Sequence, residues 1–130
     1  MIELFVDGAS AGNPGLSGIG IFIRGEGHLI QLSEPIQPTN NHIAEFTALI
    51  RGLQEVKKLG ANFVAAKSDS KIVVSSIEKN YVKNPLYQPL LKEAMDIIQN
   101  FDMFYITWLP DAQNKAADHL ARKAIQAQKS

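Results

Sequence analysis

The hydrophobic pattern changes its period near residue 40, and this change constrains the fold more than any other feature. Before it, short apolar segments are separated by glycine-rich turns, whereas directly after it, along 43–56, apolar residues recur every three to four positions. Residues 2–7, 17–24 and 28–33 therefore predict three consecutive strands, with a hairpin turn at 25–27. Strands with such short connections pair antiparallel, so we expect an N-terminal meander.

Helices and two further strands follow the meander. Asn40 and Asn41 are favoured helix N-caps, and Gly60 is a helix stop after a run of periodic apolar residues. The remaining segments predict strands at 62–68 and 103–109 and helices at 70–78, 85–100 and 113–126. A strand that is reached through a helical crossover is expected to lie parallel to its neighbour. The order βββαβααβα predicts an α/β fold: a mixed five-stranded sheet, three strands antiparallel and then two parallel, with helices on both faces.

The composition is that of a soluble globular domain, and it limits the cofactors. The 130 residues are 45% apolar and 20% charged, which predicts one domain over 1–130. No apolar run reaches the roughly 18 residues that span a bilayer, and the N-terminus does not resemble a signal peptide, so no membrane partner is expected. Zero cysteines exclude disulfides and thiolate metal sites and fit a cytoplasmic protein. Oxygen ligands and three histidines remain, and they favour Mg²⁺ or Mn²⁺ over zinc.

The charge balance argues against very tight binding to a nucleic-acid backbone. The formal net charge is zero and the isoelectric point is about 6.8, whereas nucleic-acid binders usually present a basic surface. A local basic patch is still compatible with the sequence, because several cations fall in the second half: Lys71, Lys79, Lys83, Lys92, Lys115, Arg122 and Lys123. No continuous surface patch argues for a dimer, so a monomer is expected.

Four carboxylates lie at the boundaries of predicted elements: Asp7, Glu45, Asp69 and Asp118. Each has an ordinary structural explanation when it is taken alone. Asp7 could begin a turn, and the negative charge of Glu45 could interact favourably with the dipole at the start of a helix. Asp69 could cap the helix that follows it, and Asp118 could pair with Arg122 four residues later. No single carboxylate therefore establishes a site.

Their joint placement indicates a metal site. If the first and fourth strands are adjacent and parallel, Asp7 and Asp69 lie at the same carboxyl edge of the sheet, where ligand sites of α/β folds gather. Two carboxylates about 4 Å apart repel by roughly 4 kcal/mol at an effective dielectric near 20. Lys115 is the only basic residue within these motifs and cannot neutralise four carboxylates. Two divalent cations roughly 3.5–4 Å apart would do so and could flank a scissile phosphate.

The chain resembles type 1 ribonucleases H over essentially all of its 130 residues. The motifs that carry the resemblance are 7–10 (DGAS), 12–15 (GNPG), 41–45 (NHIAE), 68–70 (SDS) and 114–121 (NKAADHLA). The resemblance implies cleavage of the RNA strand of RNA–DNA hybrids with Mg²⁺ or Mn²⁺, leaving 5′-phosphate and 3′-hydroxyl ends. It also implies that the four carboxylates are the catalytic residues and the ligands of two metal ions. The residues expected to bind the hybrid are Gly8, Ser10, Asn13, Asn41, His42, Ser70, Asn84 and Asn114.

Three departures from the family pattern suggest a minimal form, of a bacterial or archaeal kind. His42 replaces the second asparagine of the usual Thr-Asn-Asn-x-x-Glu motif when that motif is registered on Glu45. The segment between Asp69 and Asn84 is too short for the basic handle helix of many relatives. The loop at 110–113 lacks their histidine. We therefore expect weak hybrid affinity, a shallow dependence on salt, lowered activity and a preference for Mn²⁺.

Two alternatives remain open at this point. The same fold could serve as a module that binds RNA–DNA hybrids or double-stranded RNA with little or no catalytic activity. The missing loop histidine and the replacement of the second motif asparagine by His42 motivate this alternative. The chain could instead belong to another class that gathers acids on a similar sheet, such as a junction resolvase or an integrase core. The motifs at 7–10 and 12–15 argue against this second alternative.

Overall fold

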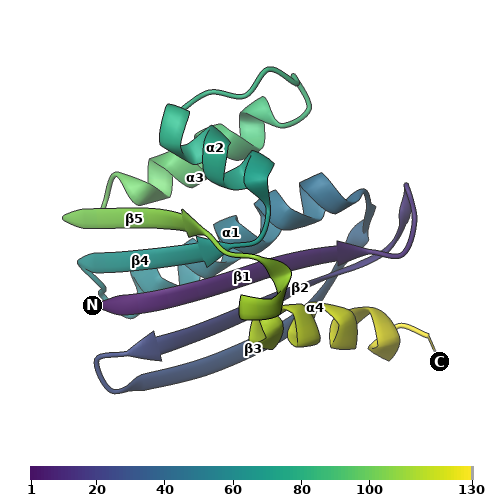
Figure 1. The fold of residues 1–130 in the computed structure, drawn as a ribbon, viewed down its shortest axis with the longest axis horizontal. Helices are drawn as coiled ribbons and strands as arrows, with labels where there is room; N and C mark the ends of the chain where they lie inside the picture. Colours follow the sequence, from purple (N-terminus) through teal and green to yellow (C-terminus); the bar gives the residue numbers. More distant parts are fainter. Residues whose placement is uncertain (130) are drawn as a thin grey trace.

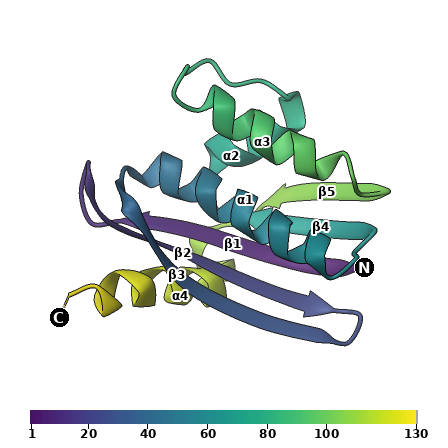
Figure 2. The same ribbon diagram turned by 180° about the vertical axis from the view of Figure 1, so that it is seen from behind.

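The computed structural model describes residues 1–129, which form a single five-stranded sheet with helices on both faces (Figures 1 and 2). The strands are β1 (Ile2–Ser10), β2 (Gly15–Gly25), β3 (His28–Thr39), β4 (Phe63–Ser68) and β5 (Met103–Trp108). The helices are α1 (Asn41–Lys58), α2 (Lys71–Lys79), α3 (Gln88–Ile98) and α4 (Lys115–Ala127), and the short 3-10 helix η1 (Asp111–Gln113) precedes α4. Within the described residues, no helix is both long and apolar enough to cross a membrane.

The strand order is β3-β2-β1-β4-β5. β1 pairs antiparallel with β2, and β2 pairs antiparallel with β3, while β4 lies parallel to β1 and β5 parallel to β4. This arrangement confirms the predicted order of elements and the predicted mixed sheet. It also places β1 at the centre, where its two edges meet strands of opposite direction.

The first and third strands are longer than the sequence indicates. Glycine and proline at 8–15 predicted a loop, but β1 continues to Ser10, which pairs with Ser17 on β2. β3 likewise runs on to Thr39, although it contains Pro35 and Pro38. β3 is an edge strand, where a missing backbone N–H costs no ladder hydrogen bond. The turn between β1 and β2 is therefore shorter than predicted, and it contains a cis peptide bond before Pro14.

The main core lies between the sheet and α1. Leu4 and Val6 of β1 are fully buried against this helix, and so are Phe46, Leu49 and Leu53 on the helix itself. Burying a side chain of this size contributes about 1.5–3 kcal/mol. α3 packs against α1 on the same side, whereas α4 crosses the opposite face over β1 and β2 (Figures 1 and 2). Side chains that alternate along β1 therefore enter two different environments.

Candidate metal centre

Asp7 and Asp69 meet at an opening in the sheet between β1 and β4. The parallel pairing of these strands ends where Val6 lies opposite Ser68. Asp7 is the next residue on β1, and Asp69 is the next after β4. The sequence predicted that Asp7 ends the first strand, but Asp7 lies inside β1, three residues before its end. The expected convergence at the carboxyl edge of the parallel strands is nevertheless present.

Two glycines allow the helices to approach close enough to bring the other carboxylates to Asp7. A Cβ atom on Gly8 would lie 2.3 Å from the backbone of Ala44, directly before Glu45. A Cβ atom on Gly20, which pairs with Asp7 on β2, would lie 2.0 Å from the carbonyl oxygen of Ala117. Neither position has room for a side chain. Backbone contact at these two points therefore sets the positions of Glu45 on α1 and of Asp118 on α4.

Other side chains cap the helices, so the acids are free to face the cleft. The Asn40 side chain accepts a hydrogen bond from the Ile43 backbone at 2.9 Å, as predicted for an N-cap. Ser70, and not Asp69, caps α2 by accepting a hydrogen bond from the Val73 backbone at 3.2 Å. Glu45 is the fifth residue of α1 and therefore lies just beyond the first turn, in which the sequence placed it.

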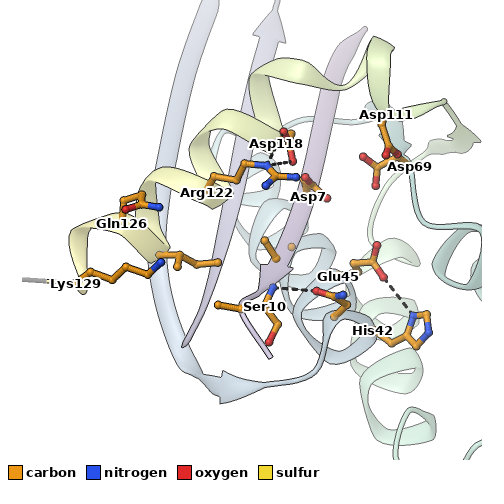
Figure 3. Close-up of a pocket in the computed structure, with 15 residues that line it drawn as sticks. Asp7, Ser10, His42, Glu45, Asp69, Asp111, Asp118, Arg122, Gln126 and Lys129 are labelled. Carbon is orange, nitrogen blue, oxygen red and sulfur yellow. Dashed lines mark hydrogen bonds and ion pairs between the residues drawn. The ribbon is translucent and has the colours of Figure 1, made fainter. Parts of the chain in front are cut away.

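Three carboxylates form a compact group. One oxygen from each of Asp7, Glu45 and Asp69 lies within 4.8 Å of one from each of the other two. Figure 3 shows these side chains, with Asp118, around one cleft of about 550 Å³. The residues that line this cleft are Asp7, Gly8, Ala9, Ser10, Ala11, Asn41, His42, Glu45, Asp69, Asp111, Asp118, Arg122, Ile125, Gln126 and Lys129. Carboxylate oxygens in this number and spacing suit a hard divalent cation such as Mg²⁺ or Mn²⁺.

The electrostatics of this group favour a bound cation. Asp7 is 7% exposed, and burial, followed by the charges of Asp69, Asp118 and Glu45, raises its pKa to about 9. Burial is also the main cause that raises the pKa of Glu45 and of Asp69. A hydrogen bond from His42 opposes the rise in the pKa of Glu45, and one from Asn114 opposes it for Asp69. Without a cation, Asp7 is therefore protonated near neutral pH, and a divalent metal would displace that proton.

Asp118 lies in the same cleft but already has a charged partner. Nε of Arg122 lies 3.0 Å from each of its two carboxylate oxygens. This is the i,i+4 pair that the sequence offered as the structural explanation for Asp118. Asp118 is also among the causes that raise the pKa of Asp7, so the two carboxyl groups are close neighbours. The fold thus gathers all four predicted acids, three of them tightly and the fourth within an ion pair.

Four of the predicted substrate-binding residues line the cleft: Gly8, Ser10, Asn41 and His42. The Ser10 backbone N–H donates to Oδ1 of Asn41 at 2.9 Å, and the Ser10 hydroxyl donates to the carbonyl oxygens of Gly12 and Thr39. These bonds tie the end of β1 to the start of α1. His42 lies 3.3 Å from Oε1 of Glu45 through its Nδ1 atom.

The other predicted substrate contacts occupy different positions. Ser70 and Asn114 are 4% and 1% exposed, so their side chains support the site from within the fold. Asn114 donates from Nδ2 to the carbonyl oxygen of Val6 at 3.0 Å and to Oδ2 of Asp69 at 3.3 Å. Asn84 lines a second groove together with His42, and Asn13 is an exposed residue of the turn after β1.

Sequence reasoning missed two residues that shape the site. Trp108 donates from Nε1 to the carbonyl oxygen of Asp69 at 3.0 Å and so fixes the backbone of that carboxylate. No local sequence pattern predicts this contact, because it joins residues at the ends of two different strands, 39 positions apart. Gly20 had a readable signal: glycine at alternate positions 18 and 20 of a strand indicates the close approach of another backbone.

Comparisons with known proteins agree with this geometry. Residues 5–124 match a family model described as reverse transcriptase-like. The putative hydrolase EbsB of Enterococcus faecalis is 49% identical over 97% of this chain and 95% of its own length. A ribonuclease H of Desulforamulus reducens is 39% identical over 96% of this chain and 87% of its own length. Longer mycobacterial relatives also match, and the chain spans 36% of their length.

The fold has a close counterpart among solved structures. LC11-RNase H1, isolated from compost and crystallised with an RNA/DNA hybrid, superposes with a TM-score of 0.91. The two chains are 30% identical, and the match covers 100% of each. The predicted fold class is therefore confirmed by an independent structure as well as by the strand order.

Proposed function

Since the chain belongs to the ribonuclease H family, we propose that it hydrolyses the RNA strand of RNA–DNA hybrids with Mg²⁺ or Mn²⁺. The observation that carries this proposal is the group of carboxylates from Asp7, Glu45 and Asp69, whose oxygens lie within 4.8 Å in an open cleft. Asp7 and Asp69 have no ion-pair partner among residues 1–129. A protein that leaves such a group uncompensated is suited to binding divalent cations.

In this proposal, Asp7, Glu45 and Asp69 hold one cation, and Asp7 and Asp118 help to hold a second. Two such cations, when bound, supply an activated water and stabilise the leaving 3′-oxygen, which gives 5′-phosphate and 3′-hydroxyl ends. The chain's own contribution is to fix its ligands. Asn114 and Trp108 hold Asp69 through its side chain and backbone.

The surroundings of the cleft fit a nucleic-acid substrate. His42 lies on both the cleft and a second groove, which Tyr81 and two lysines also line. Tyr81 is 62% exposed, and Lys79 and Lys83 can contact a sugar–phosphate backbone. An RNA strand presents 2′-hydroxyls, which both donate and accept hydrogen bonds, so the Asn41 amide and the loop backbone are suited to recognise it.

Cleavage of a labelled RNA–DNA hybrid tests the proposal. The purified protein is incubated with the hybrid and either Mg²⁺ or Mn²⁺, beside the Asp69→Asn variant as a control. We expect cleavage of the RNA strand alone by the unsubstituted chain, with 3′-hydroxyl ends that a polymerase can extend. If the unsubstituted chain matches the Asp69→Asn control in both metals, the proposed activity is wrong. Cleavage of four-way junctions but not of hybrids would point to a different nuclease class.

One observation favours a second candidate, a binding module for hybrids or double-stranded RNA with negligible turnover. The segment before α4 presents Asp111 to the cleft, and its charge contributes to the raised pKa of Asp69. Among the described residues that line the cleft, His42 is the only histidine, and it belongs to α1. Fluorescence anisotropy with a labelled hybrid distinguishes the candidates. Saturable binding without any product after long incubation favours the module.

A further inference from the structure

We propose that Arg122 is a positioning residue that competes with a cation for Asp118 and so makes the two cation positions unequal. In the absence of substrate, one divalent ion then binds well and the second binds weakly, because the second must first break the Arg122–Asp118 ion pair. This inference deepens the proposed function and rests on it. It assigns a role to a side chain that the family motifs of the sequence do not include.

The contact between Arg122 and Asp118 is specific. Nε of Arg122 lies 3.0 Å from Oδ1 and 3.0 Å from Oδ2, so one guanidinium N–H spans both oxygens that a metal would use. The two side chains come from consecutive turns of α4. Figure 3 shows the guanidinium beside Asp118, with Asp7 close by. The hydrogen bond to Asp118 and, after it, the charges of Asp118 and Asp7 raise the pKa of Arg122, so the guanidinium lies near both carboxylates.

The other three carboxylates are in a different situation. Asp7, Glu45 and Asp69 bring their oxygens within 4.8 Å of one another, and Asp118 does not belong to this group. The ion-pair partner of Glu45 is His42 at 3.3 Å, which is charged only when it is protonated. Among the ion pairs, a cation that enters this side displaces only the His42 contact of Glu45. A cation that needs Asp118 must displace a permanent positive charge.

A simpler reading is that the pair only stabilises α4, as i,i+4 pairs do on exposed helices. The lining of the cleft argues against this reading. Arg122 lines it together with Gln126 and Lys129, whereas the adjacent Lys123 does not. The Arg122 side chain is 72% exposed and that of Asp118 is 36% exposed. A pair of this exposure shifts an equilibrium by about two- to fivefold, which can order two binding events and still yield to a divalent ion.

Mn²⁺ binding to the metal-free protein tests the inference directly. The spectrum of free Mn²⁺, followed by electron paramagnetic resonance, gives the number of ions bound and the affinity of each class. We expect one strong and one weak class in the unsubstituted chain. Arg122→Gln should tighten the weak class about two- to fivefold and leave the strong class unchanged. Asp118→Asn should abolish the weak class.

Lys123→Gln is the matched control, because it removes the same charge one residue along on the exposed face of α4. It should alter neither class, and Arg122→Lys should fall between Arg122→Gln and the unsubstituted chain. Equal effects of Arg122→Gln and Lys123→Gln, two equal classes in the unsubstituted chain, or a weakened second class in Arg122→Gln would each overturn the inference. Failure to bind any Mn²⁺ would overturn the proposed function as well. Normal strong binding with no effect of Arg122→Gln would overturn this inference alone.

Discussion

Glu3 and Asp7 lie four residues apart on β1 and point to the same face of the sheet, yet their environments are opposite. Glu3 accepts hydrogen bonds from Arg24, at 2.8 Å, and from Lys67. These hydrogen bonds are the main causes that lower its pKa to about 2. Burial and neighbouring carboxylates raise the pKa of Asp7 to about 9. One strand thus carries a carboxylate that the protein neutralises and another that it leaves uncompensated.

The cross-strand partners explain the difference. Glu3 lies opposite Arg24 on β2, whereas Asp7 lies opposite Gly20. On the β4 side, Lys67 reaches Glu3, whereas Asp69 follows the end of the pairing near Asp7. The fold is therefore able to supply cations to a carboxylate on this strand and does not do so at the site. An uncompensated group of this kind is retained where function requires it, at a cost in stability.

Removing the uncompensated charge should have the largest effect. We expect Asp7→Asn to lower hybrid cleavage on the order of a thousandfold, because it removes a ligand and a charge from the reacting site. The same change should stabilise the metal-free protein by about 1–3 kcal/mol near neutral pH, because folding no longer requires uptake of a proton. Hybrid cleavage assays measure the first outcome, and thermal melts measure the second. In melts with and without Mn²⁺, the metal-induced rise in melting temperature should also disappear. A destabilised variant that still responds to Mn²⁺ would contradict the contrast with Glu3.

Moving a helix away from the site should have the next largest effect. Gly20→Ala places a Cβ atom 2.0 Å from the carbonyl oxygen of Ala117, so α4 must shift and carry Asp118 with it. We expect a loss of about 1–3 kcal/mol in the free energy of unfolding, as for an overpacked core. Cleavage at a temperature where the protein remains folded should fall as well.

Gly60→Ala provides the control for this shift. Gly60 has φ of +75° and lies beyond the end of α1, so the change strains the backbone and costs roughly 1 kcal/mol. Gly60→Ala should therefore lower stability but leave cleavage unchanged at a temperature where the protein remains folded. If both variants lose cleavage in proportion to stability, the position of Asp118 does not depend on the contact at Gly20.

The same contrast shows what the sequence could and could not predict. Regular spacing of apolar residues, as along 43–56, gave the order and type of the elements. The limits of β1 and β3 were not predictable, because pairing between neighbouring strands overrode the local signals of glycine and proline. The meeting of the four carboxylates at one cleft could be predicted, because each stands in a family motif at the boundary of an element. The pair of Arg122 with Asp118 was readable from its i,i+4 spacing. The contacts of Trp108 and Asn114 depend on tertiary packing, which leaves no local signature.

The pH dependence of stability should separate the two carboxylates. Asp7 has a raised pKa, so its contribution to stability is fully present below about pH 4 and is lost as the pH rises towards 9. Glu3 has a lowered pKa, so its contribution is present above about pH 5 and is lost as the pH falls towards 2. Between pH 5 and 8, the metal-free protein should lose up to about 1.4 kcal/mol per pH unit.

Thermal melts of metal-free protein across this pH range measure both windows. Asp7→Asn should flatten the decline above pH 5, and Mn²⁺ should oppose it increasingly as the pH rises, because ligand protons are then easier to displace. A decline that is equally steep in Asp7→Asn would assign it to another group. The acidic limb below pH 5 should remain in that variant, because it belongs to Glu3.

Glu3→Gln should have the smallest effect, because its partners keep other contacts. Arg24 and Lys67 each lie 5.1 Å from the centroid of the Phe5 ring, which attracts cations without a carboxylate. The Glu3 side chain is 32% exposed and that of Arg24 is 54% exposed, so the charge pairs are partly screened by water. We expect a loss of about 0.5–1 kcal/mol at neutral pH and an unchanged response to Mn²⁺. If Glu3→Gln alters the affinity for Mn²⁺, the ion pairs of Glu3 are coupled to the carboxylates around Asp7 along β1. The contrast between the two ends of the strand would then be wrong.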